Sequence, residues 1–308
     1  MLTLNHILVD LDPSRDSQPA LNKAIELVKI SGAQLELFLA IDDGRYVSNW
    51  FISEEQLEQA KANSVASHKR WLKTYLDEVQ DQGISANMEV VWHKPHYQAI
   101  INKLKSFPAS LVIKSTHPHP TVSKIFFTPN DWQLLKSCPV PLLLVKETST
   151  RPYQNLLACV DPTHIGGNHE GLNTEILDLS VELTQSLKLD THIFHSCEPM
   201  GLETWQAMPE MGGISPEEHK SYLDNLLHKH TELLKDLTAP YEFGQSQLSI
   251  KLGDPISCIC EEVKSTHADL LVLGTTYHTG LIGTTAERVL DEVSCDILAV
   301  KSKQFVPV

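Results

Sequence analysis

Several features that mark particular classes of protein are missing from this sequence. No apolar run approaches the length that crosses a membrane, and residues 1 to 12 form neither a basic leader nor a small-residue cleavage site. Lysine and arginine total 25 against 39 acidic residues, a formal net charge of −14, and they form no dense basic cluster. We therefore expect a cytoplasmic protein that binds neither membranes nor nucleic acid directly.

Cysteine is also sparse. The chain has too few cysteines for a disulfide scaffold, and a reducing compartment fits them, because most lie inside apolar segments as reduced core cysteines do. They are Cys138, Cys159, Cys197, Cys258, Cys260 and Cys295.

The sequence motifs of common catalytic sites are absent as well. There is no G-x-S-x-G nucleophile turn, no G-x4-G-K-[ST] phosphate loop and no H-E-x-x-H metal motif. We predict that the protein is not an enzyme, with weak hydrolysis of ATP as the alternative.

Histidine, in contrast, is plentiful, with 15 in 308 residues. Residues two apart on a helix point away from each other, and no compact four-ligand pattern appears, so we predict no metal site. A zinc site remains the alternative, above all at the pair His117/His119. The other close pairs are His93/His96, His192/His195, His228/His230 and Cys258/Cys260.

Short runs rich in valine, isoleucine and leucine alternate with longer segments of helical period, which predicts an α/β fold with parallel strands. The expected strands are His6 to Leu11, Leu35 to Ile41, Met88 to Trp92, Leu111 to Lys114, Leu142 to Lys146, Asn155 to Val160, Thr191 to His195, Gln247 to Leu252, Leu270 to Leu273 and Ile297 to Lys301. The expected helices are Gln18 to Ser31, Glu54 to Gln82, Tyr97 to Lys105, Asp131 to Ser137, Asn173 to Leu187, Pro216 to Leu237, Pro255 to Ser265 and Thr285 to Val293.

The two halves of the chain repeat each other. "HILVDLDP", ending at Pro13, matches "LLACVDP", ending at Pro162, and each half starts its longest helix with a capping signature, at Ser53 and at Ser215. The polar stretch Glu147 to Gln154 has the composition of a linker. We therefore expect two domains, at residues 1–147 and 155–304.

Ligands of open parallel sheets bind beyond the carboxyl ends of the strands, where the strand order reverses. An aspartate followed by proline ends the first strand of each half, at Asp12 and at Asp161. Each carboxylate is a candidate hydrogen-bond acceptor for an amino-bearing ring. The competing interpretation is a turn, which Asp-Pro starts in many proteins.

The loop after the fourth strand differs between the halves. In the second half "GTTYHTGLIGTTAER", residues 274 to 288, brings glycines and threonines ahead of a helix, a pattern typical of a phosphate-binding loop or of a flexible connection. The matching residues 114 to 132 contain three prolines and no glycine. Proline offers no amide hydrogen, so we expect the first half not to bind a polyphosphate.

These segments resemble the universal stress proteins, in particular their tandem bacterial type E members, over nearly the whole chain. The segments are "VVWHKPHYQAII", "FTPNDWQLLKSCPVP" and "LGTTYHTGLIGTTAERVLDEVSCDILAVK". The resemblance implies two adenine nucleotide alpha hydrolase-like domains, each with five parallel strands in the order 3-2-1-4-5. It also implies pairing through the last strand of each domain, so Leu142 to Val145 and Ile297 to Val300 should lie close together.

The resemblance further implies a nucleotide site in the second half, formed by Asp161, Ser196, Gly274, Gly280, Gly283 and Thr284. In the first half only Asp12 and Ala40 match, which makes that site degenerate. The sequence departs from the family pattern at Tyr277, which replaces a glycine, and its loop is about four residues shorter, so ATP or a related nucleotide is not the only candidate ligand.

Taken together, we expect a stress-response protein that binds a small ligand in its second domain and uses the first as a scaffold, with resistance to DNA damage among the implied roles. The alternatives are a weak ATPase, a binder of an apolar or nucleotide-sugar ligand, and a pair of domains that docks another protein. The two halves should form an internal pseudo-dimer, alone or within a homodimer. Contact with an apolar ligand or with a partner, or packing within the protein, would explain the apolar side chains that follow the second strand of the second half. They are Met200, Trp205, Met208 and Met211.

Overall fold

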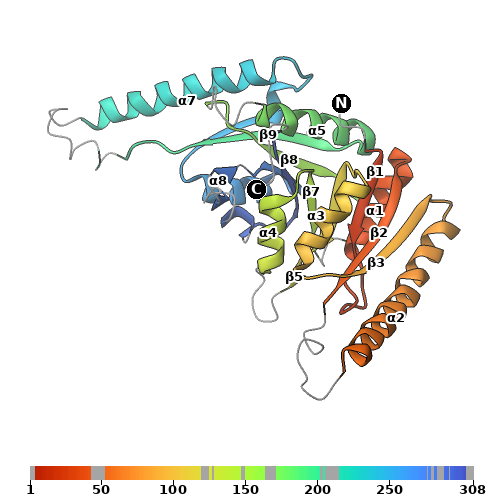
Figure 1. Ribbon diagram of the computed structural model, residues 1–308. Helices are drawn as coiled ribbons and strands as arrows, with labels where there is room; N and C mark the ends of the chain where they lie inside the picture. The colour runs from red at the N-terminus through yellow and green to blue at the C-terminus, as the bar shows by residue number, and fades with distance from the viewer. Residues whose placement is uncertain are drawn as a thin grey trace.

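The computed structural model describes residues 4–42, 53–118, 125–126, 128–146, 150–163, 171–201, 204, 215–275, 277–278, 281–282, 288–290 and 292–302. The predicted α/β architecture is confirmed (Figure 1). The first half contains β1 (His6–Asp10), α1 (Pro19–Ser31), β2 (Gln34–Ile41), α2 (Glu54–Asp81), β3 (Ala86–Trp92), α3 (His96–Ser106), β4 (Leu111–Ser115), β5 (His117–Pro118), β6 (Ile125–Phe126), α4 (Pro129–Ser137) and β7 (Leu142–Val145). The second half contains β8 (Asn155–Cys159), α5 (Leu172–Leu187), β9 (Asp190–Cys197), α7 (Pro216–Thr238), the 3-10 turn η3 (Gln245–Gln247), β10 (Leu248–Leu252), α8 (Pro255–Ser265), β11 (Leu270–Gly274), β12 (Tyr277–His278), β13 (Leu281–Ile282) and β14 (Asp296–Val300).

One ten-stranded sheet runs through the molecule in the order β10-β9-β8-β11-β14-β7-β4-β1-β2-β3. Neighbouring strands are parallel within each half, and the two halves meet where β14 pairs antiparallel with β7. Leu143 lies opposite Leu298 there, so the predicted proximity of the two last strands is confirmed.

Helices cover both faces of this sheet, and alternation along each strand supplies both cores. Ile7 and Val9 of β1 pack into one apolar cluster, with α1, α2, α5 and α7, while Leu8 packs into the other, with α3, α4 and α8. Each cluster contains side chains from both halves, so the two domains share their hydrophobic layers.

The junction between the halves is pinned by a buried carboxylate. Asp296, at the start of β14, accepts hydrogen bonds from the Lys146 amide at 2.8 Å and from the Tyr153 hydroxyl at 2.6 Å. Two lysines then link the halves reciprocally. Lys146 Nζ donates to the carbonyl of Val293 in the second half, and Lys301 Nζ donates to the carbonyl of Lys136 near the end of α4 in the first. A cation at the C-terminal end of α4 is favourable, because backbone carbonyls there lack partners.

The two longest helices lie at opposite ends of the molecule (Figure 1). Both start with the predicted capping box, in which Ser53 and Gln56 cap α2, and Ser215 and Glu218 cap α7. Within α7 the buried side chains are Leu234 and Thr238, so this helix is anchored near its C-terminal end.

Small antiparallel hairpins stand where the sequence predicted only loops after the fourth strand of each half. They are β5 with β6 in the first half and β12 with β13 in the second. Two-residue strands carry no periodic signal, which explains why the sequence did not predict them.

Candidate functional site

Each of the two predicted aspartates forms a tight turn just beyond the first strand of its half. Asp161 Oδ1 accepts hydrogen bonds from the Thr163 amide at 3.0 Å and hydroxyl at 2.6 Å. Asp12 Oδ1 accepts the same pair of bonds from Ser14, at 2.9 and 2.6 Å. The turn interpretation is therefore correct for one oxygen of each carboxylate.

A side-chain amide fixes the backbone of each aspartate. Asn173, in the first turn of α5, accepts from the Asp161 amide at 3.0 Å and donates to its carbonyl at 2.7 Å. Gln18, just ahead of α1, makes the corresponding pair of bonds with Asp12, at 3.1 and 2.6 Å. The two halves thus present their aspartates in the same way, tied to the helix that follows.

Three of the residues predicted to bind a nucleotide come together in the second half. Asp161, Ser196 and Gly274 lie at the carboxyl ends of β8, β9 and β11, which are adjacent in the sheet. The register pairs Cys159 with Phe194 and with Leu273, so each of the three lies one or two residues beyond a paired position.

Gly274 has a packing role that the sequence did not predict. A Cβ atom at this position would lie 2.6 Å from Leu172 Cδ2 and 3.3 Å from Ile176 Cδ1, so the glycine lets α5 approach β11 closely. The first half has Ser115 here, whose hydroxyl accepts a hydrogen bond from the Ala20 amide at 3.1 Å and caps the start of α1. The glycine at the start of the loop is therefore explained by α5 without a ligand.

The other predicted loop residues, Gly280, Gly283 and Thr284, lie outside the described residues. In the first half, Ala40 is buried in a hydrophobic cluster at the position that corresponds to Ser196.

A chain of polar contacts that the sequence did not predict lies beside Asp161. His195 Nδ1 is 3.1 Å from the carbonyl oxygen of Val160, and His195 Nε2 is 2.8 Å from Nδ1 of His230 on α7. The other nitrogen of His230 is 3.3 Å from the sulfur of Cys197. Sequence spacing pairs His195 with His192 and His230 with His228, whereas the fold joins the two histidines that are 35 residues apart.

Burial favours the uncharged form of His195, His230 and Cys197. Burial lowers the pKa of His195 and of His230, and the Asp161 carboxylate opposes this effect at both rings. Burial also raises the pKa of the Cys197 thiol, and Asp161 raises it further. A thiolate–imidazolium pair is therefore disfavoured in both of its members.

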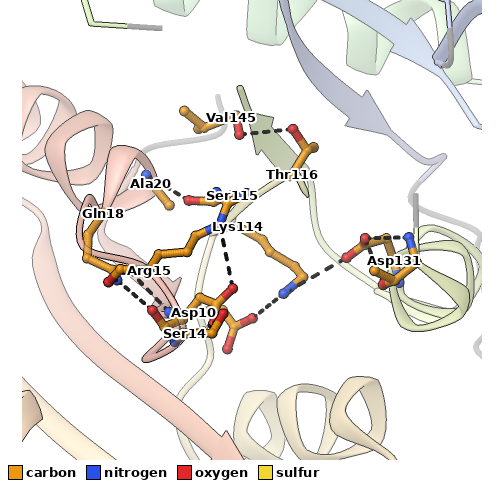
Figure 2. A network of polar contacts seen from close by, with 12 residues as sticks. Asp10, Ser14, Arg15, Gln18, Ala20, Lys114, Ser115, Thr116, Asp131 and Val145 are labelled. Carbon is orange, nitrogen blue, oxygen red and sulfur yellow. Dashed lines mark hydrogen bonds and ion pairs between the residues drawn. The ribbon is translucent and has the colours of Figure 1, made fainter. Parts of the chain in front are cut away.

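The first half instead places a buried ion network at its own strand ends (Figure 2). Lys114 Nζ lies 2.7 Å from Asp10 Oδ2 and 3.9 Å from Asp131 Oδ1, and both carboxylates are buried. His96, at the start of α3, places its Nε2 2.9 Å from the same Asp10 oxygen. Strands β1 and β4 and helices α3 and α4 are thus joined through charged groups.

The charges within the ion network shift the pKa values of its own members. Burial alone would raise the pKa of Asp10, but the positive charges of His96 and Lys114 outweigh it and hold that pKa well below its usual range. Burial alone would lower the pKa of Lys114, but Asp10 and Asp131 outweigh it and raise that pKa. Asp10 and Lys114 therefore remain an ion pair at neutral pH.

The second half carries uncharged residues at the corresponding positions. Alignment of the repeats places Cys159 opposite Asp10, Leu273 opposite Lys114 and Pro255 opposite His96, since each of these last two begins its helix. Leu273 belongs to the hydrophobic cluster on that face of the sheet, and Cys159 packs against it. The polar residues of the His195 chain are matched in turn by Leu39 and Ile41 in the first half.

Within the part of the chain that the structure describes, no group of three or more histidine, cysteine or acidic side chains is arranged to hold a metal ion. Among these same residues, no helix is both long enough and apolar enough to cross a membrane. His119, Trp205, Met208 and Met211 lie outside the described residues. Met200 is described, and its backbone contacts Tyr222 and His219 of α7 at 3.2 and 3.1 Å.

Comparison with known proteins matches both halves of the chain, at residues 3–146 and 152–301, to the universal stress protein family. The universal stress protein E of Photorhabdus laumondii is 29% identical over 309 residues, covering 99% of this chain and 97% of the relative. Universal stress protein E of Escherichia coli K12 is 26% identical, covering 99% and 96%. Among solved structures, a universal stress protein from Archaeoglobus fulgidus superposes with a TM-score of 0.68 at 13% identity, covering 97% of this chain and 98% of that one.

Proposed function

Since this chain belongs to the universal stress protein family in both halves, we propose that it is a stress-response protein that binds a small, nucleotide-like ligand in its second domain. The first domain, residues 1–147, serves as a scaffold, and the ligand site belongs to the second, residues 155–304. The binding residues are Asp161, Ser196 and Gly274, with the following loop.

The contrast between the two halves carries this proposal. In the first half Lys114, Asp10 and Asp131 occupy the crossover point, where the lysine forms ion pairs with both carboxylates. A ligand there would have to replace buried ion pairs, at a cost of several kcal/mol, about 3–5 when one partner is left unpaired. The second half keeps the same aspartate turn, but Cys159 and Leu273 replace the ions. A ligand in this half meets no such cost.

The proposal is tested by isothermal titration of the dialysed protein with ATP and Mg²⁺. Asp161→Asn keeps an oxygen for the turn with Thr163 and removes the charge, so we expect a single binding site whose affinity falls about tenfold or more in this variant. Asp12→Asn is the matched control in the first half and should bind as the wild type does.

Two results would contradict the proposal. If Asp12→Asn lost binding while Asp161→Asn bound as the wild type does, the site would lie in the first half. An absence of heat in every sample, together with an empty second half in native mass spectrometry of the purified protein, would exclude a small ligand there.

A second candidate rests on the hairpin in the loop. Strands β12 and β13 occupy four of the positions between Gly274 and Gly283, where the sequence indicated a phosphate-binding loop or a flexible connection. This favours an apolar ligand, or a nucleotide sugar with two phosphates, over ATP with three. Native mass spectrometry that identifies the retained ligand separates the two candidates. Turnover of ATP that disappears in Asp161→Asn would instead indicate a weak ATPase.

A further inference from the structure

The chain formed by Val160, His195, His230 and Cys197 has only one arrangement of hydrogens when both rings are neutral. The Val160 carbonyl can only accept, so His195 carries its hydrogen on Nδ1 and accepts at Nε2. His230 must then donate from Nδ1 to His195 and accept at Nε2, where the Cys197 thiol donates. Every polar atom of the two rings is satisfied.

This chain of hydrogen bonds stays intact when it binds one extra proton but not when it binds two. With one, His195 donates from Nε2 to Nδ1 of His230, whose own hydrogen moves to Nε2 and points at the weakly accepting sulfur of Cys197. With two, both rings are imidazolium ions, and an N–H of His195 faces an N–H of His230 across a contact that is now 2.8 Å long. Two donors cannot share that contact, and the two like charges repel each other.

The contact matters for the position of α7. The buried residues of this helix, Leu234 and Thr238, both lie C-terminal to His230. Upstream, His219 and Tyr222 contact the backbone of Met200. His219 donates to a carbonyl there, so that bond survives protonation of its ring. The number of protons bound to His195 and His230 therefore determines how the upstream part of α7 contacts the sheet at His230.

We propose that the His195–His230 contact is an acid-sensitive joint that holds the N-terminal part of α7 against β9 at neutral pH and releases it when both rings bind a proton. This inference does not depend on which ligand the second half binds.

The charged groups around the two histidines determine the pH range in which both rings bind protons. Asp161, just beyond β8, favours the charged rings, whereas burial and Lys229 of α7 disfavour a charged His230. Lys251 of β10 is engaged with Glu261 and Glu262 of α8. Since burial is the largest effect and lowers both histidine pKa values, release requires a pH below that at which exposed histidines titrate.

Hydrogen–deuterium exchange of the full chain tests the joint, with rates corrected for the intrinsic effect of pH and α8 as internal reference. Between pH 7.5 and 5.0 we expect the protection of residues 216–229 to fall relative to α8 by at least about tenfold, which one proton bound over one pH unit can supply. His230→Gln offers an amide that does not titrate, so its pH dependence should be lost. His228→Gln, on the exposed side of the same helix, should behave as the wild type does.

Protection of α7 that does not change with pH, or His230→Gln that keeps the full change, would overturn the proposal. If His230→Gln loosens α7 at every pH, NMR titration of the ring nitrogens in the wild type decides. We expect His195 and His230 to titrate as one coupled pair, with pKa values below the ordinary histidine value. Two independent transitions at ordinary values would equally refute the joint.

Discussion

At the scale of single residues, the site combines groups that sequence reasoning found with groups that it missed. Asp12 and Asp161 were predicted because each repeats after a strand, and the structure adds that each fixes its own turn. Lys114 and Asp10 were missed, because one charged residue inside an apolar strand carries no periodic signal and its partner is 104 residues away. His230 was missed for the same reason, because it lies 35 residues from His195 in the sequence.

The ion network gives a prediction about stability. Asp10→Cys and Lys114→Leu copy the residues of the second half, and each alone leaves a buried charge without its partner, which should cost about 3–5 kcal/mol of unfolding free energy. The double variant removes both members of this pair, although it leaves Asp131 without Lys114, and it should cost less than the two single changes added together. Urea unfolding at pH 7 measures all three, and costs that simply add would show that the pair is not coupled.

Asp10 also predicts a pH dependence. Its pKa is lower in the folded protein than in the unfolded chain, so between the two values the unfolded state binds more protons. The stabilisation is complete above the ordinary carboxyl pKa, about 4, and declines as the pH falls below it. Urea unfolding of the wild type and of Asp10→Asn from pH 7 to pH 3 should therefore give curves whose separation is constant above about pH 4–5 and narrows towards pH 3. Curves that stay parallel would mean that Asp10 does not supply this dependence.

At the scale of helices and strands, prediction from sequence succeeded where segments were long or capped. The strands of the main sheet and the described helices lie within a few residues of their expected bounds, because apolar runs and helical period persist over several residues. The helix expected at Thr285 to Val293 lies partly outside the described residues. The hairpins β5–β6 and β12–β13 were missed, since pairs of residues are too short to show any period. The consequence for the candidate site is direct, because β12–β13 lies in its loop.

The capping boxes give a prediction at this scale. Ser215→Ala removes the acceptor for the Glu218 amide, at 3.2 Å, and should cost about 1 kcal/mol, or a roughly fivefold loss of protection in the first turn of α7. Hydrogen exchange of the wild type and variant measures it. Ser53→Ala is the matched change on α2 and should leave α7 unaffected; an equal effect of both on α7 would point to a global loss of stability.

At the scale of the whole molecule, the two halves are joined by shared structure. They share a sheet, both hydrophobic clusters and the contacts of Asp296. The sequence predicted the pairing of the last strands through its resemblance, but the lysines that cross the junction have no signal of their own.

Asp296→Ala should therefore weaken both halves together. It leaves the Lys146 amide and the Tyr153 hydroxyl buried without an acceptor, at about 1–3 kcal/mol each. Four of the five tryptophans, Trp50, Trp71, Trp92 and Trp132, are in the first half. We expect thermal unfolding followed by tryptophan fluorescence and by circular dichroism to coincide and to shift down equally in the variant. Separate transitions, with only one displaced, would mean that the halves unfold independently.

The antiparallel junction of β7 and β14 also bears on how the two repeats diverge. Both strands belong to one polypeptide, so each half always meets the same partner in equal amount, and neither has to remain compatible with a copy of itself. A substitution on one side of the junction has to be compensated only by a substitution on the other side. This freedom from self-recognition accounts for how one repeat could acquire an internal ion network and the other a histidine pair, while their common scaffold stayed intact.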